Sequence, residues 1–157
     1  MDFLWNFDVV SFEESLLRLV LALCFGIILG LERDAKDKPI DFRAYMIICV
    51  TTCMLAIMGQ ELYEDYSGAN NVVSVDLAKI ISGVLTGIGF LGAGAIIKRS
   101  NDDVVGTATG ASVWASGAIG LSLGFGMYGL AIIVFLLIAA TLFTGKILLR
   151  KTEEAAE

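Results

Sequence analysis

Ten residues that could form a polar site stand inside or at the ends of long apolar segments of this sequence. Six are charged, and the others are hydroxyl residues or tryptophan: Arg18, Glu32, Arg33, Arg43, Asp76, Lys79, Thr107, Thr109, Trp114 and Ser116. Arg18 interrupts an otherwise apolar run, and an ionisable side chain within a bilayer is costly unless it is paired or functional. These residues are the candidates for a charged or hydrogen-bonding site inside a helical bundle. Glu14 stands in the favourable i,i+4 position before Arg18. Our hypothesis is that Arg18 also meets an acid or hydroxyls of the third or fourth apolar segment, with Asp76 as the first candidate because both lie at the predicted outer end.

The same residues also have a structural interpretation. Charges near helix ends can reach the membrane interface and set the topology, and hydroxyl groups in membrane helices usually bond to the helix backbone or to a neighbouring helix. Trp114 lies in the middle of its segment, where it fills space left by small residues or closes a cavity. The sequence alone leaves both interpretations open.

Catalytic and metal chemistry are not indicated. The sequence has no histidine, which removes the usual general base near neutral pH. Cys24, Cys49 and Cys53 all lie in apolar runs, and their odd number predicts packing rather than a disulfide framework or a metal site. Residues 87–92 spell GxGxxG, but within a membrane-length apolar segment, so they predict helix packing rather than a dinucleotide site. We expect no enzyme activity, no cofactor, no bound metal and no nucleic-acid partner.

Composition makes the lipid bilayer the main solvent of this chain. Of its 157 residues, 57% are hydrophobic and 18% are charged, and the mean hydropathy is +0.79. A helix of about 20 apolar residues spans the hydrocarbon core. Five segments of roughly this kind cover residues 15–31, 44–60, 77–97, 104–125 and 127–149. The predicted fold is an all-α polytopic membrane bundle of about five transmembrane helices, with residues 1–157 as one domain and no soluble C-terminal domain.

Glycine is concentrated where these helices must approach one another. More than half of the 17 glycines fall between residues 77 and 125, and small residues let helix backbones pack closely in membranes. The small faces should therefore pack against each other or against copies of the chain, in a homo-oligomer whose first expected state is a dimer. The glycines assigned to helix packing are Gly26, Gly30, Gly83, Gly87, Gly89, Gly92, Gly94, Gly106, Gly110, Gly117 and Gly120.

Basic residues predict the orientation of the bundle. Lys and Arg near span ends mark the cytoplasmic side, and nine of the eleven fall in residues 32–43, in residues 98–103 and near the C-terminus. The N-terminal region, residues 61–76 and the turn at 125–127 contain almost none. The N-terminus is therefore predicted outside and the C-terminus in the cytoplasm. The outer face then carries the net charge of −6, which either attracts divalent cations or is simply solvated.

Five features follow one another along the chain. They are Arg18-Leu followed by Ala22, Gly26 and Gly30-Leu-Glu-Arg33, then Arg43, then Asp76-x-x-Lys79, then Gly87-Ile-Gly-Phe-Leu-Gly-Ala-Gly94, then Gly106-Thr-Ala-Thr-Gly with Trp114 and Gly120. Together they resemble the MgtC/SapB family of bacterial inner-membrane proteins. The resemblance runs from about residue 15 to 145. It implies a multi-pass plasma-membrane protein linked to growth under magnesium limitation and, in pathogens, to virulence. It also implies a regulatory partner such as the rotary ATP synthase.

Two departures from the family pattern affect what the resemblance implies. Many members carry a soluble cytoplasmic domain after the last helix, whereas this sequence stops at Glu157. Where the family usually has Leu-Arg-Thr, this chain has Phe42-Arg43-Ala44, so a site built on that threonine hydroxyl would be lost.

Three classes of function follow from the sequence. The first is a regulatory membrane protein that binds another membrane complex, which rests on the resemblance. The second is an oligomeric channel or transporter for magnesium or another small solute, which the glycine-rich and hydroxyl-bearing third and fourth segments favour. The third, a membrane enzyme, is the weakest because the sequence has no nucleophile–base pair or metal cluster.

The predicted topology can be tested with reporter fusions. A reporter that works only outside the cytoplasm should be active when fused at Ser67 and silent when fused at Asn101 or after Glu157, because the bases lie on the cytoplasmic side. Reporter activity at the C-terminal fusion would contradict the five-helix arrangement.

Overall fold

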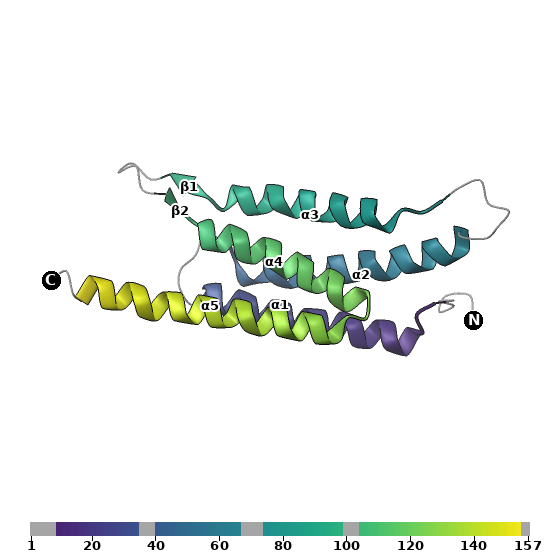
Figure 1. The fold of residues 1–157 in the computed structure, drawn as a ribbon, viewed down its shortest axis with the longest axis horizontal. Coiled ribbons are helices and arrows are strands. Elements are labelled where there is room, and N and C mark those ends of the chain that lie inside the picture. Colours follow the sequence, from purple (N-terminus) through teal and green to yellow (C-terminus); the bar gives the residue numbers. More distant parts are fainter. Residues whose placement is uncertain (1–8, 35–39, 67–73, 99–103, 155–157) are drawn as a thin grey trace.

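The computed structural model describes residues 9–34, 40–66, 74–98 and 104–154, and this part of the chain forms five helices and one short hairpin (Figure 1). In chain order the elements are α1 (Phe12–Asp34), α2 (Phe42–Tyr66), α3 (Leu77–Gly94), β1 (Ile97–Lys98), β2 (Val104–Val105), α4 (Thr107–Gly124) and α5 (Tyr128–Glu154). The strands pair antiparallel, with Ile97 opposite Val105. The all-α prediction is confirmed.

Three helices in the described part of the chain are long and apolar enough to cross a membrane. They are α1 over Phe12–Arg33, α2 and α3. Helix α4 has 18 residues but is rich in glycine and hydroxyl residues, and the apolar described part of α5, Tyr128–Leu142, is shorter than a span. A helical membrane bundle is thus confirmed, whereas five spans and the outside location of the N-terminus remain predictions.

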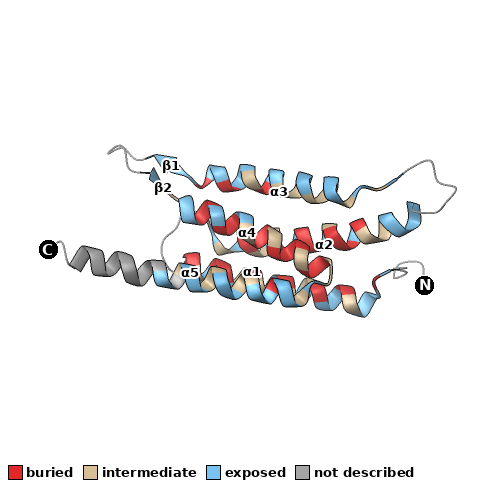
Figure 2. Ribbon diagram, in the orientation of Figure 1, coloured by how far each residue is buried: buried red, intermediate tan, exposed pale blue. Residues whose placement is uncertain are grey.

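Helix α4 is the centre of the bundle. It contacts all four other helices, and buried residues gather on α4 and on the helices beside it (Figure 2). Cys49 and Cys53 of α2 pack in the core with Val113, Ile119 and Leu123 of α4. The two cysteines therefore pack as small apolar residues, as the sequence predicts. Helix α5 is held in part by the stacking of rings Phe25 and Phe135, whose centroids lie 4.6 Å apart.

Helix backbones approach closely at several glycines that face a neighbouring helix. A Cβ atom placed on Gly26 of α1 would lie 2.8 Å from the Cα of Met46 in α2, and one placed on Gly92 of α3 would lie 2.8 Å from the carbonyl oxygen of Gly110 in α4. Only hydrogen fits in such gaps. The predicted packing glycines that face the backbone of another element in this way are Gly26, Gly30, Gly92, Gly106, Gly110 and Gly120, whereas Gly117 faces the side chain of Ile88.

The other four predicted packing glycines lie on α3 without a close neighbour, and two of them, Gly83 and Gly87, border a groove between α2 and α3. Around Gly83, Gly87, Gly89 and Gly94, no atom of the described chain beyond the helix itself lies within 4 Å of where a Cβ would stand. Much of α3 is accordingly exposed, in contrast to α4 (Figure 2). Packing within the chain does not involve these four positions, and packing against a copy of the chain remains open for them.

The connection between α3 and α4 differs from the predicted boundary. The sequence predicts a third helix that runs to Ile97, whereas α3 ends at Gly94 and Ile97 lies in β1. Gly106 precedes α4 with a φ of +92°, a left-handed conformation that glycine adopts without strain. A Cβ there would collide with the carbonyl oxygen of Ala95. The prediction was wrong here because the chain turns through a hairpin held close to the end of α3.

Close backbone approach makes Gly26 a sensitive position. We expect Gly26→Leu to lower the stability of the purified protein in detergent by about 1–3 kcal/mol, the usual range for overpacking, because α1 and α2 must separate. Gly129→Leu is the matched control, because Gly129 has no such neighbour within 4 Å. Equal melting temperatures for the two variants would contradict the close packing of α1 on α2.

Candidate functional site

Arg18 of α1 is buried and donates hydrogen bonds to three different elements. Its Nη1 donates to the carbonyl oxygen of Gly124 at 2.5 Å, and its Nε donates to the hydroxyl of Tyr128 at 3.3 Å and to Oε1 of Glu14 at 3.2 Å. Nη2 also pairs with the Glu14 carboxylate. Only 7% of the residue is exposed. The arginine thus joins the first turns of α1 to the end of α4 and the start of α5.

Gln60 of α2 donates to the same main-chain oxygen. Its Nε2 lies 2.7 Å from the Gly124 carbonyl oxygen and 3.1 Å from the carbonyl oxygen of Ala56. The last carbonyls of a helix have no partner within the helix, and in a membrane each must find one. Side chains of α1 and α2 therefore cap the C-terminal end of α4. We call Glu14, Arg18, Gln60, Gly124 and Tyr128 the Arg18 network.

Two further features border the Arg18 network. Gly126, with a φ of +72°, lies against the guanidinium group, because a Cβ on it would stand 3.0 Å from Nη2 of Arg18. One turn before Arg18 on α1, the Ser15 hydroxyl is buried, and within the described residues it has no hydrogen-bond partner. At the same end of the bundle, Glu61 accepts a hydrogen bond from the main-chain nitrogen of Val10 at 2.8 Å.

The sequence hypothesis that Arg18 pairs with Asp76 is wrong. Asp76 caps α3 instead, and its Oδ1 accepts hydrogen bonds from the main-chain nitrogens of Ala78 and Lys79 at 3.0 and 3.3 Å. Helix α4 also lies between α3 and α1 (Figure 1), so the two side chains belong to opposite sides of the bundle. Lys79 reaches Asp76 only at 4.0 Å, and its side chain is 85% exposed.

The charged candidates at the other end of the bundle fall into two environments. Arg33 is buried, and its Nε donates to Oε2 of Glu32 at 2.5 Å. Arg43 is exposed, and its Nε donates to Oδ2 of Asp41 at 2.8 Å. The hydrogen bonds from the Arg43 side chain and from its main-chain nitrogen lower the pKa of Asp41. Arg33 therefore belongs to the packed end of α1, whereas Arg43 belongs to the surface.

The predicted hydroxyl residues of α4 mostly bond to their own helix. Ser116 donates to the carbonyl oxygen of Val113 at 2.7 Å. Ser112 donates to the carbonyl oxygen of Thr109 at 2.9 Å and also lies 3.0 Å from the hydroxyl of Tyr45. Thr109 is itself buried. This geometry favours a structural role over the lining of a polar path.

Two of the predicted α4 residues lie on its outer side. Thr107 is exposed at the first turn of the helix. Trp114 is 45% exposed. The structure therefore does not bring these two residues into the Arg18 network.

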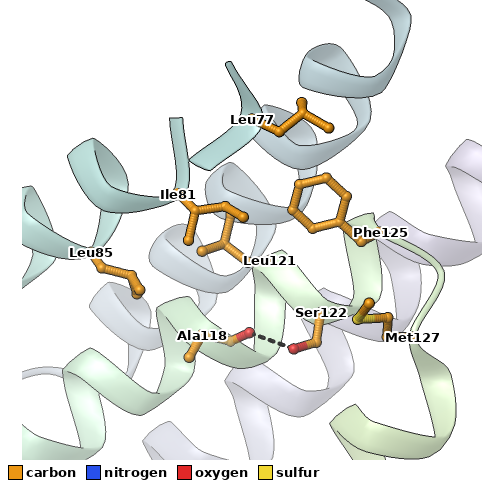
Figure 3. A pocket seen from close by; sticks show the side chains of 8 residues that line it. All are labelled: Leu77, Ile81, Leu85, Ala118, Leu121, Ser122, Phe125 and Met127. Atoms are coloured by element: carbon orange, nitrogen blue, oxygen red, sulfur yellow. Dashed lines mark hydrogen bonds between the residues drawn. The ribbon is translucent and has the colours of Figure 1, made fainter. Parts of the chain in front are cut away.

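Two grooves beside α3 are apolar. One, of about 350 Å³, lies between α3 and α4 and is lined by Leu77, Ile81, Leu85, Ala118, Leu121, Ser122, Phe125 and Met127 (Figure 3). Its one hydroxyl, that of Ser122, donates to the carbonyl oxygen of Ala118 at 2.9 Å. The other groove, of about 320 Å³, lies between α2 and α3. Such walls suit hydrocarbon rather than a hydrated ion.

Sequence reasoning finds Arg18 and its i,i+4 neighbour Glu14, which pairs with it, but misses the partners on the other helices. Gln60 ends an apolar segment and Tyr128 follows a short turn, and these positions are the signals that could have indicated them. Gly124 takes part through its main-chain carbonyl oxygen, and because every residue has such an oxygen, the sequence gives no signal for it. Among the described residues, no group of three or more Asp, Glu or Cys side chains could hold a metal ion.

A bundle of apolar helices, closed at one end by a buried arginine that caps another helix, defines an α-helical membrane protein. A comparison with known protein families agrees with this class and identifies the family. The MgtC family model matches residues 19–151, and this chain belongs to the MgtC family.

Several named bacterial proteins are similar to this chain. SapB of Bacillus subtilis is 33% identical over 137 residues, covering 86% of this chain and 57% of SapB. YhiD of Escherichia coli K12 is 34% identical over 119 residues, covering 76% of this chain and 54% of YhiD. MgtC of Salmonella typhimurium LT2 is 27% identical over 113 residues, covering 72% of this chain and 44% of MgtC. The chain spans about half the length of the curated relatives it matches. No solved structure matches it.

The shared acceptor in the Arg18 network predicts energetic coupling. Arg18→Ala and Gln60→Ala should each lower the unfolding temperature in detergent, because each removes a donor to the Gly124 carbonyl oxygen. Residues in one network typically show interaction energies of about 0.5–3 kcal/mol, so the double variant should depart from the sum of the two single effects. Strict additivity, measured by thermal unfolding of all four proteins, would show that the two donors act independently.

Proposed function

We propose that this chain is the transmembrane domain of a bacterial inner-membrane protein that adapts the cell to low magnesium by regulating another membrane complex. Membership of the MgtC family supports the location and the link to magnesium. The name of the relative YhiD provisionally describes it as a magnesium transporter. The rotary ATP synthase is the partner that the family resemblance implies, and residues 1–157 would form one domain without a catalytic role.

One observation favours a regulator over a transporter: apart from the Ser15 hydroxyl, the polar side-chain groups buried in the described part of the bundle bond to each other or to the backbone. Arg18 and Gln60 cap α4, and Ser112 and Ser116 bond to their own helix. The buried hydroxyl of Thr52 likewise donates to the carbonyl oxygen of Cys49, and the core around these hydroxyl groups is a cluster of hydrophobic side chains. A path for a hydrated ion needs a succession of accessible polar groups, and the described part of a single chain offers no such succession.

A transporter remains the second candidate because of the relative YhiD. An oligomer could form a path between subunits, and the exposed glycines and hydroxyls of α3 would then line it. This alternative requires that α3 faces water in the assembled protein. The regulator requires only that some face of the bundle meets a partner within the bilayer.

Magnesium flux separates the two candidates. Proteoliposomes that contain the purified protein and a magnesium-sensitive dye should take up magnesium no faster than empty liposomes under an inward gradient. The gene for the same protein should restore growth in low-magnesium medium to a strain that lacks it. A saturable, protein-dependent flux would overturn the regulator and establish the transporter.

A further inference from the structure

Helix α3 has an exposed face made of small residues around one large side chain, and one edge of this face, at Gly83 and Gly87, borders the groove between α2 and α3. Gly83, Gly87 and Gly94 have open space where a Cβ would be. Phe90 lies among them and is 81% exposed. The opposite side of α3, with Ile88 and Gly92, is buried against the bundle. We call Asp76, Lys79, Gly83, Gly87, Phe90 and Gly94 the α3 face.

This composition is unlike that of a helix face that meets lipid. The exposed side of α5 in the same protein carries bulky aliphatic residues, among them Leu130, Ile133 and Leu137. Glycine contributes no side chain to lipid and lowers helix propensity, so its use in a membrane helix is close approach to another helix. Within the chain, Gly92 lets α3 approach the backbone of α4 closely. The α3 face could be approached in the same way by a helix of another molecule.

We propose that the α3 face binds the α3 face of a second copy of this chain across a two-fold axis normal to the membrane. The surface is self-complementary, as a two-fold interface requires. Phe90 projects from α3. Gly87 and Gly94, one turn before and one turn after it, leave hollows on the surface of the same helix. Phe90 of each copy then seats beside the glycines of the other, with the two backbones close together.

The charged residues at one end of the α3 face also favour a second copy of the chain as its partner. Asp76 and Lys79 lie one turn apart at the start of α3, and their mutual distance of 4.0 Å with exposed side chains is a weak contact. In a parallel pair of helices related by a two-fold axis, Lys79 of each copy lies near Asp76 of the other. Two equivalent ion pairs then close the end of the interface at the membrane surface.

Cysteine cross-linking tests this interface in native membranes. In a Cys24→Ser background, Gly83→Cys should give a covalent homodimer on mild oxidation, because a disulfide forms when Cα atoms come within about 4.4–6.8 Å. The remaining cysteines, Cys49 and Cys53, are buried. Gly129→Cys is the matched control, because that glycine is equally open but lies on α5. It should not cross-link.

A bulky substitution gives an independent measurement. An isoleucine in place of Gly83 has room within the chain, so circular dichroism of the Gly83→Ile variant should show unchanged helix content. Native mass spectrometry should show roughly tenfold less dimer, which corresponds to a loss of about 1.4 kcal/mol of binding free energy. Gly129→Ile should leave the dimer unchanged. The proposal is overturned if Gly83→Cys cross-links no more than Gly129→Cys, if it cross-links to a protein of another mass, or if Gly83→Ile leaves the dimer intact. These results do not depend on magnesium flux, so they stand apart from the proposed function.

Discussion

The close contact between the backbones of α4 and α2 is the constraint on which the rest of the structure depends. Within a bilayer, apolar side chains gain little by leaving lipid, so helices associate through dense packing and hydrogen bonds. Gly120 and Gly124 of α4 press against the main chain of α2 near Cys49 and Cys53. Because α4 has no bulk on this side, it can occupy the centre of the bundle and contact every other helix.

A central α4 brings its C-terminal end close to the side chains of α1 and α2, and this explains the arginine in an apolar run. The Gly124 carbonyl oxygen cannot be left without a donor in a low-dielectric environment. Arg18 and Gln60 both supply one. Glu14 in turn balances the charge of the guanidinium group. The cost of burying Arg18 is thus offset by capping a helix end, a role that requires neither a second buried acid nor a ligand.

The sequence predicts the helices, the close-approach glycines and the importance of Arg18, because hydropathy and small-residue spacing are local properties. It indicates Glu14 as an i,i+4 neighbour of Arg18 but not the partners of Arg18 on other helices. Asp76 was the first candidate among these, but its side chain satisfies free N–H groups at the start of α3, and Arg18 instead donates to a main-chain oxygen of α4 and to a hydroxyl of α5. It also cannot divide the α3 glycines into those that pack within the chain and those that do not, since Gly87 and Gly92 look alike until the direction of the helix is known.

Helix α3 and the Arg18 network are connected through the turn between α4 and α5. Gly92 and Gly110 join α3 to α4 near the hairpin, whereas the first half of α3 borders the apolar groove that it forms with α4. Phe125 and Met127 form part of one groove wall (Figure 3), and they lie in the turn that begins at Gly124, the acceptor for Arg18. The first half of α3 and the Arg18 network therefore meet at one turn, and we expect a contact that displaces this half of α3 to alter the groove between them.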